Sequence, residues 1–189
     1  MPLDASQNGL VLPLLGLLVE QPSHAYALAA RLRERYGDLP ATRSTVATLL
    51  KSLERAGLVA ARLPEQVGNR PARTVYRLTP GGADELRRKV ETGIAEGRPA
   101  SVDFLMAVAY LAVLDADRAA GLLAARADRL DGDLAALRDR PEGVAEAHML
   151  EAAYWRVVVS AEAAWTRTLA SRVRSRDIEW PGVTEGQEG

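Results

Sequence analysis

The spacing of apolar residues predicts three short helices in the first third of the chain. Residues 10–20 are almost continuously apolar, and a polar break separates them from a second amphipathic stretch over 24–35. Ser23 is expected to cap that second helix. A third apolar face precedes Gly57, where a left-handed turn is expected to end the helix; it consists of Val46, Leu49, Leu50 and Leu53.

Two β-prone runs and a new helix follow the third helix. The runs cover 58–63 and 74–78, and the polar, turn-forming sequence GNRPAR between them predicts a hairpin. Thr79-Pro80 then begins a helix that extends to residue 97, with the threonine as its cap and the proline at its first position. Three helices, a two-stranded hairpin and a further helix are the order of a winged helix-turn-helix.

The second half of the chain has no strand signal and is expected to be entirely helical. Residues 102–114 predict a buried helix, and Asp115 is expected to cap the next one. The expected joint between the halves lies near Arg98-Pro99. We therefore predict a mainly α protein with a winged-helix domain over 8–98, a helical dimerisation and effector domain over 99–177 and a disordered tail over 178–189.

Two apolar stripes in this second half require packing partners. One has the spacing of a coiled-coil seam and comprises Leu123, Ala127, Leu130, Leu134 and Leu137. The other follows a helix expected over 144–176 and comprises Leu150, Tyr154, Val157, Ala161, Trp165 and Leu169. A helix of this length exceeds what a small domain buries, so a second copy of the chain is the simplest partner, in a two-fold dimer. Closure of both stripes within one chain is the alternative.

Charge is unevenly distributed between the two halves. The 189 residues hold 24 Lys and Arg against 25 Asp and Glu, yet residues 1–99 carry a net +4 and residues 100–189 a net −5. Within 41–80 there are 7 basic residues and 2 acidic ones. A basic module favours contact with nucleic acid, because a polyanion responds to the local field. The alternative is that these arginines form only a solvated surface.

Several classes of protein are excluded by what the chain lacks. Without cysteine it has no disulfide, thiolate zinc site or cysteine nucleophile. His24 and His148 show no metal-ligand spacing, and no phosphate loop, nucleophile elbow or dinucleotide fingerprint occurs, so we predict no enzyme, catalytic residue, metal or cofactor. The apolar run before residue 20 is too short for a bilayer and lacks the flanks of a signal peptide. We therefore expect a cytoplasmic protein with no membrane partner.

Three segments of the first half resemble the PadR family of bacterial transcriptional regulators, of the kind with a longer C-terminal helical domain. They read LLGLLVEQPSHAYALAARL, TLLKSLERAGLV and RPARTVYRLTPGG, and together they span about residues 10–90. The second half is similar only in length, helicity and a long final helix. The resemblance implies a homodimeric DNA-binding repressor that often controls neighbouring genes and, in some members, is released by a small aromatic or amphiphilic compound.

The chain departs from the family pattern at two places. Ala25 stands where the family commonly has glycine, and Ala47-Thr48 stands where its recognition helix usually has Tyr-Pro. Because that tyrosine tends to contact the phosphate backbone, one anchoring contact is missing, and Arg43 or Thr48 is the candidate substitute. The operator sequence is not implied by the resemblance.

The candidate DNA-binding residues lie on the second helix, the third helix and the hairpin. The N-terminal part of a recognition helix usually meets base edges in the major groove, which makes Arg43 the best candidate for bidentate contact with guanine. Lys51 is expected to bind phosphate, and Arg70 and Arg73 to lie along the minor groove. Tyr26 resembles a tyrosine that the family retains, with packing as the alternative role. The full set is Tyr26, Arg43, Ser44, Thr45, Thr48, Lys51, Arg70 and Arg73.

Aromatic residues of the second half are the candidates for binding an effector. Large planar side chains at a dimer interface can hold a planar apolar ligand by stacking and burial. The candidates are Tyr110, Tyr154, Trp155 and Trp165. Their alternative role is core and interface packing.

The sequence as a whole predicts a homodimeric repressor of double-stranded DNA. Two recognition helices would enter successive major grooves of a pseudo-palindromic site, and an effector would favour a dimer geometry that no longer fits that spacing. One alternative is a winged helix that serves as a protein-interaction module, which the departure at Ala47-Thr48 supports and the basic hairpin opposes. Another is a transcriptional activator, which shares the DNA chemistry and differs only in where its site lies.

Overall fold

The computed structural model describes residues 8–37, 41–65, 73–137, 143 and 145–181, and for 63–65 and 73 it describes the backbone alone. The chain divides into two compact units, Met1–Lys89 and Val90–Gly189, and the division falls inside a helix. The sequence predicted a domain boundary between residues 98 and 99. That the chain folds as two independent domains meeting there remains a prediction.

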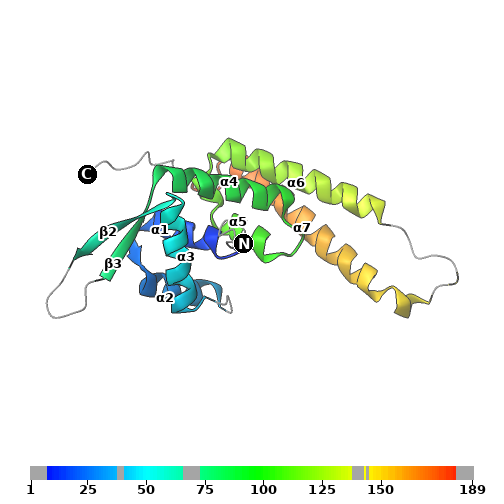
Figure 1. Ribbon diagram of the computed structural model, residues 1–189. Helices are drawn as coiled ribbons and strands as arrows, with labels where there is room; N and C mark the ends of the chain where they lie inside the picture. Colours follow the sequence, from blue (N-terminus) through cyan, green and yellow to red (C-terminus); the bar gives the residue numbers. More distant parts are fainter. Residues whose placement is uncertain (1–7, 38–40, 66–72, 138–142, 144, 182–189) are drawn as a thin grey trace. The chain divides into compact units, whose positions relative to one another are not determined.

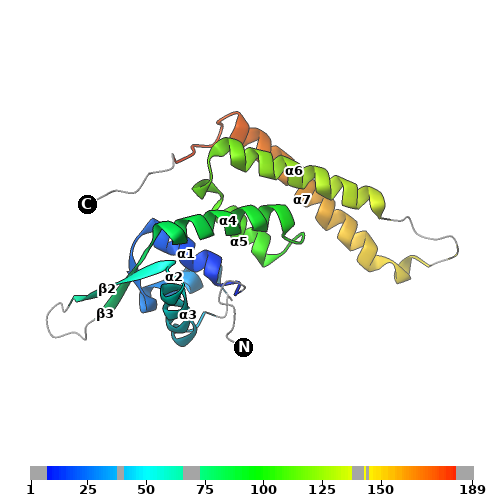
Figure 2. The same ribbon diagram turned by 45° about the horizontal axis from the view of Figure 1, so that its top comes forward.

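The first unit combines helices with a small antiparallel sheet (Figures 1 and 2). Helix α1 packs against α2 and β3, α2 packs on α3, and α3 contacts β2. The sheet has the strand order β1-β3-β2. The elements are α1 (Val11–Glu20), β1 (Ser23–His24), α2 (Ala25–Tyr36), α3 (Arg43–Arg55), β2 (Val59–Glu65), β3 (Arg73–Leu78) and α4 (Pro80–Glu96), whose last turns belong to the second unit. The winged helix-turn-helix predicted from the sequence is thereby confirmed.

The structure corrects the start of α2. The sequence suggested Ser23 as its cap, but the Ala27 amide donates to Nδ1 of His24 at 3.1 Å. Ser23 instead belongs to β1, where it pairs with Tyr76 of β3. The sequence did not predict this strand, because two residues are too few to show an alternating pattern and the partner strand lies far along the chain.

The turn at the end of α3 and the start of α4 follow the predicted turn chemistry. Gly57 has φ +73°, the left-handed conformation expected at the end of α3. The Thr79 hydroxyl donates to the Gly57 carbonyl at 2.7 Å and accepts from the Gly82 amide at 3.0 Å, so Thr79 caps α4 and ties it to the end of α3. A Cβ on Gly82 would lie 2.0 Å from the Leu58 carbonyl oxygen, and this close approach requires glycine.

The second unit is helical throughout its described part. It contains α5 (Val102–Ala109), η2 (Leu111–Val113), α6 (Ala116–Ala136), η3 (Glu146–His148) and α7 (Leu150–Arg174). Helices α6 and α7 lie side by side and antiparallel in both views (Figures 1 and 2). The Asp115 side chain accepts from the Arg118 amide at 2.7 Å, which confirms the predicted cap of α6.

Two helix boundaries in this unit differ from the prediction. The single helix expected over 102–114 ends at Ala109 and continues as the short 3₁₀ turn η2. The last helix, expected from residue 144, begins at Leu150 after the 3₁₀ turn η3. Apolar periodicity does not distinguish a tightened turn from a continuing α-helix, which explains both differences.

The two apolar stripes of this unit differ in their burial. On α6, Leu123, Ala127 and Leu130 are buried, and Leu130 and Leu134 pack against Val159 and Ala163 of α7. The expectation that the α6 seam needs a second chain is therefore wrong. The α7 stripe, in contrast, is mostly exposed, since α7 buries another face, made of Val159, Ala163, Thr166, Ala170 and Val173.

The chain beyond α7 makes a contact that the predicted tail boundary did not anticipate. Trp180 is half-buried, and its indole N–H donates to the Leu114 carbonyl at 2.9 Å. Among the helices of the described part, none is long and apolar enough to cross a membrane.

Candidate nucleic-acid interface

Helix α3 separates apolar and polar residues onto two faces. Val46, Leu49, Leu50 and Leu53 are at most 8% exposed and pack into the core of the first unit. The other face carries a row of hydroxyl groups with a cation at each end. The cations are Arg43 and Lys51, and the hydroxyl groups belong to Ser44, Thr45 and Thr48; all are exposed except the half-buried Thr45. The buried face fixes the helix, so the polar face is left for a ligand.

Hydroxyl groups organise the first turn of α3. The Thr45 amide donates to the Thr42 hydroxyl at 3.1 Å, and this hydroxyl lies 2.9 Å from that of Ser44 and 2.8 Å from that of Thr45. The first turn contains no acidic residue. The positive end of the helix dipole and Arg43 therefore act together, and both favour an anion.

Arg43 and Tyr26 lie in direct contact between α3 and α2. The guanidinium carbon of Arg43 lies 4.1 Å from the centre of the Tyr26 ring, within the range of a cation–π interaction. The Tyr26 ring in turn meets His24 edge to face, with ring centres 6.2 Å apart. Tyr26 is 49% exposed, which fits both a contact with DNA and its alternative role as a half-buried packing aromatic.

An open hollow of about 630 Å³ adjoins this contact. It is lined by His24, Ala25, Tyr26, Arg43, Thr74 and Tyr76. Among the described residues, the lining therefore combines one guanidinium with hydroxyl and imidazole groups and includes no carboxylate. Such a surface suits an anion.

The strands contribute to this hollow through one face of the sheet. Thr74 and Tyr76 both line the hollow, as residues two apart on a strand share a face. Tyr76 is 7% exposed; burial first, and the charge of Glu54 second, raise the pKa of its phenol. Tyr76 is consequently a packing residue with one edge at the hollow.

The predicted tip of the hairpin is only partly described. Arg70 lies outside the described residues, and of Arg73 only the backbone is described, at the start of β3. Two other arginines, Arg62 and Arg77, are exposed on the hairpin strands and were not singled out from the sequence. The alternation of apolar and polar residues along each strand was the signal that could have identified these two arginines as exposed.

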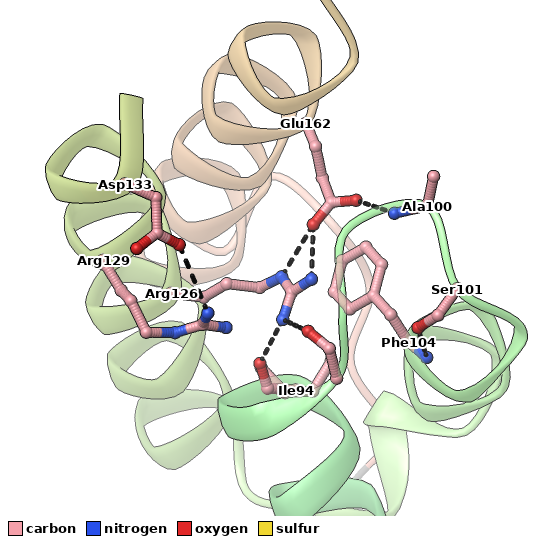
Figure 3. Close-up of polar contacts among 9 residues, drawn as sticks. Ile94, Ala100, Ser101, Phe104, Arg126, Arg129, Asp133 and Glu162 are labelled. Atoms are coloured by element: carbon pink, nitrogen blue, oxygen red, sulfur yellow. Dashed lines mark hydrogen bonds and ion pairs between the residues drawn. The ribbon is translucent and has the colours of Figure 1, made fainter. Parts of the chain in front are cut away.

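The second unit holds a buried charge that the sequence did not reveal. The fully buried guanidinium of Arg126 donates to Oε1 of Glu162 from Nε at 2.9 Å and from Nη2 as well. Its Nη1 donates to the Ile94 and Gly97 carbonyls at 2.8 and 2.9 Å. Figure 3 shows these contacts and the second oxygen of Glu162, which accepts from the Ala100 amide at 2.7 Å.

Burial and hydrogen bonding act in opposite directions on this arginine. Desolvation lowers the pKa of Arg126, while its hydrogen bond to Glu162 raises it. The guanidinium also lies over the Phe104 ring, 3.8 Å from the ring centre. All three guanidinium nitrogens thus donate hydrogen bonds within the protein, which makes Arg126 a structural crosslink between α6, α7 and the end of α4.

The four candidate effector residues do not form one cluster. Tyr110 is buried, at 5% exposure, whereas Tyr154, Trp155 and Trp165 are 67%, 40% and 47% exposed. Tyr154 and Trp165 are separated by about 16 Å along α7, given the rise of a helix. Trp165 also packs edge to face with Phe104, with ring centres 6.3 Å apart. No group of three His, Cys, Asp or Glu side chains suited to a metal occurs among the described residues.

One family model matches the chain. It is that of the Transcriptional regulator PadR-like family, and it covers residues 14–88, which include α2, α3 and both hairpin strands. Among curated proteins no significant match was found.

Three solved structures illustrate the likeness to known folds. A PadR family transcription regulator from Clostridium difficile is 24% identical over 43% of this chain and 83% of its own, with a TM-score of 0.39. A putative transcriptional regulator from Thermoplasma acidophilum is 31% identical over 40% of this chain and 70% of its own, with a TM-score of 0.35. Bacillus subtilis PadR in complex with operator DNA is 18% identical over 88% of this chain and 99% of its own, with a TM-score of 0.43.

Proposed function

The chain belongs, through residues 14–88, to the PadR-like family of transcriptional regulators, and we propose that it is a homodimeric repressor that binds a pseudo-palindromic operator. Its α3 helices would enter successive major grooves, about one helical turn apart. The protein acts in the cytoplasm as a binding protein rather than an enzyme. Its proposed partners are double-stranded DNA, a second copy of itself and a small planar effector.

The polar face of α3 is the observation that carries this proposal. Its apolar face is buried and its first turn has no acidic side chain, while Arg43, Thr48 and Lys51 are exposed. Cations and hydroxyl groups are the side chains that most often contact phosphate and sugar, and arginine is also suited to guanine. Exposed Arg62 and Arg77 extend the positive charge onto the hairpin strands.

The exposed stripe of α7 supports the dimer. Leu150, Tyr154 and Val157 are 59%, 67% and 68% exposed, although apolar residues at helical spacing normally face a partner. A second copy of the chain offers the same stripe, so a two-fold axis would bury both at once. A planar effector would bind beside Trp155 or Trp165 and act by favouring one of two dimer geometries.

A binding assay with the DNA that flanks the chain's own gene tests the proposal. We expect tight binding to one segment, weaker binding to unrelated duplexes, and affinity that falls steeply with salt as phosphate counterions are released. Equal affinity for every duplex would reduce the protein to a non-specific binder. No binding to any duplex, even at low salt, would instead favour the protein-interaction module.

A double variant tests whether α3 is the recognition helix. Arg43→Ala with Lys51→Ala should abolish specific binding and leave the dimer unchanged, since neither side chain lies on the α7 stripe. The matched control, Arg87→Ala with Arg88→Ala, removes the same charge from α4 and should retain specific binding. Sedimentation at micromolar concentration completes the test, because a stable monomer would contradict the proposed dimer.

A further inference from the structure

The contact between Tyr26 and Arg43 joins two helices at the edge of the hollow. Tyr26 lies in the first turn of α2, and Arg43 is the first residue of α3. Both side chains are exposed, yet the guanidinium carbon is only 4.1 Å from the ring centre. The arginine therefore turns across to α2.

The Tyr26 ring is itself supported from the opposite direction. His24 meets it edge to face, with an angle of 73° between the ring planes. The imidazole of His24 is held by its cap contact, in which Nδ1 accepts from the Ala27 amide at 3.1 Å. His24, Tyr26 and Arg43 thus form a row in which each member limits the movement of the next.

We propose that Tyr26 is a positioning residue that holds Arg43 ready for a DNA backbone phosphate, which enters the hollow beside them. This inference rests on the proposed function. Of the two roles predicted for Arg43 from the sequence, contact with guanine and substitution for the missing phosphate anchor, it selects the phosphate. It also assigns Tyr26 to Arg43, through its ring, and not to the DNA through its hydroxyl.

The geometry of stacking leaves the arginine able to bind an anion. A guanidinium stacks through its flat face and donates hydrogen bonds through its edge, so the two interactions do not compete. Phosphate oxygens match that edge, and a charge-assisted pair is stronger than a neutral hydrogen bond. Holding the side chain in place beforehand reduces the conformational entropy that it would lose on binding.

The surroundings favour a phosphate over a base edge. The hollow lies between the first turn of α2 and β3, whose Thr74 and Tyr76 line it, and the described residues of its lining include no carboxylate. Arg43 faces this hollow from the start of α3. Thr48, further along the exposed face of that helix, remains for the floor of the major groove, and Lys51 remains for a second phosphate.

Substitutions of Tyr26 and Arg43 distinguish the contributions of the tyrosine ring, the tyrosine hydroxyl and the arginine charge to DNA binding. The variants are Tyr26→Phe, Tyr26→Leu, Arg43→Met and the double variant Tyr26→Leu with Arg43→Met, each measured by fluorescence anisotropy on the DNA flanking the gene and on an unrelated duplex, over a salt series. Arg33→Met is the matched control. It removes an exposed charge from the last turn of α2, about 10 Å along the helix from Tyr26.

The expected results follow from the assigned roles. Tyr26→Phe should bind as the wild type does, and Tyr26→Leu about two- to fivefold more weakly, the range for an exposed cation–π contact. Arg43→Met should weaken both duplexes equally, by about tenfold, and lower the slope of log affinity against log salt by about 0.9. The double variant should match Arg43→Met, because the ring acts only through the arginine. Arg33→Met should keep the wild-type slope.

Three outcomes would overturn the inference. If Arg43→Met relaxed discrimination at one base pair and kept the salt slope, Arg43 would read a base. If Tyr26→Phe bound as weakly as Tyr26→Leu, the hydroxyl would itself contact DNA. If the two single losses added in the double variant, the residues would act independently.

A measurement without DNA distinguishes failure of this inference from failure of the proposed function. In the free protein, NMR signals of the Arg43 side chain should show an upfield ring-current shift that Tyr26→Phe retains and Tyr26→Leu removes. Absence of that shift in the wild type would refute the positioning role even if the protein binds DNA. Its presence in a protein that binds no duplex would confirm the pairing, refute the phosphate role and reject the proposed function.

Discussion

The two units of this protein place charged and apolar side chains in opposite ways. In the first unit the apolar face of α3 is buried and Arg43 and Lys51 are exposed. In the second unit Arg126 is buried, while Tyr154 and Val157 are 67% and 68% exposed. The first unit thus closes its own core and presents charge, whereas the second leaves large apolar side chains exposed.

This contrast shows that one residue type has two physical roles in the same chain. An exposed arginine contributes little to folding, since water already solvates it. A buried arginine must have every donor satisfied, because desolvation is costly and an unpaired partner is costlier still. Comparing substitutions of the two kinds of arginine therefore tests the contrast directly.

The largest expected effect comes from replacing the buried arginine. Arg126→Met should lower the free energy of unfolding by about 3–5 kcal/mol, because it leaves Glu162 buried without its cation. The same change at exposed Arg43 should cost no more than about 1 kcal/mol. Urea denaturation of both variants checks this. If the double variant Arg126→Met with Glu162→Gln recovers part of the lost stability, the unpaired carboxylate is the cause of the loss. Equal losses of stability for Arg126→Met and Arg43→Met would contradict the contrast between the two units.

The next test compares the closed seam with the open stripe. Leu130→Ala should cost about 2–5 kcal/mol of folding stability at every protein concentration, because it opens a cavity between α6 and α7. Val157→Ser should instead promote dissociation of the dimer, and any loss of stability should depend on concentration. Urea denaturation at several concentrations, together with sedimentation, separates the two. A Val157→Ser protein that remains dimeric would show that the stripe is not the interface.

A smaller effect distinguishes the buried hydroxyl groups of the two units. Thr166 is fully buried, and its hydroxyl has no hydrogen-bond partner among the described residues. Thr166→Val should therefore stabilise the protein by about 1 kcal/mol, since it removes an unsatisfied group and nearly keeps the shape. In the first unit the Ser23 hydroxyl donates to the Gln21 carbonyl, so Ser23→Ala should be slightly destabilising, by about 0.5 kcal/mol. Thermal denaturation would show shifts of opposite sign; a loss in both variants would contradict this prediction.

The smallest effect concerns a surface ion pair of the second unit and depends on pH. Hydrogen bonding to Arg118, at 2.8 and 2.9 Å, lowers the pKa of the Glu91 carboxyl. The pair therefore stabilises the folded state above the pKa of Glu91 in the unfolded chain, and this contribution is lost as the pH falls through its folded pKa. The difference in urea midpoint between wild type and Arg118→Gln should be present at neutral pH and disappear in acid. A difference that persists at low pH would rule out titration of Glu91 as its source.

The sequence by itself determined the elements whose causes are local. Helical periodicity gave α1 and α3, and the caps Thr79 and Asp115 and the turn at Gly57 lie where neighbouring residues required them. These signals span only a few residues, so they can be recognised in the sequence without knowledge of the tertiary structure. The face of α3 that carries Arg43 and Lys51 could be predicted for the same reason.

Tertiary structure alone decided which distant residues meet. The strand β1 exists only because β3 pairs with it, and the contact of Tyr26 with Arg43 depends on how α2 packs on α3. The pattern of α7 offered two faces, and only the position of α6 selected Val159 and Ala163 for burial. Nothing near Arg126 in the chain marks it as buried, because its partners come from other segments. Periodicity specifies that a residue shares a face with others, whereas burial and pairing depend on what the fold brings against that face.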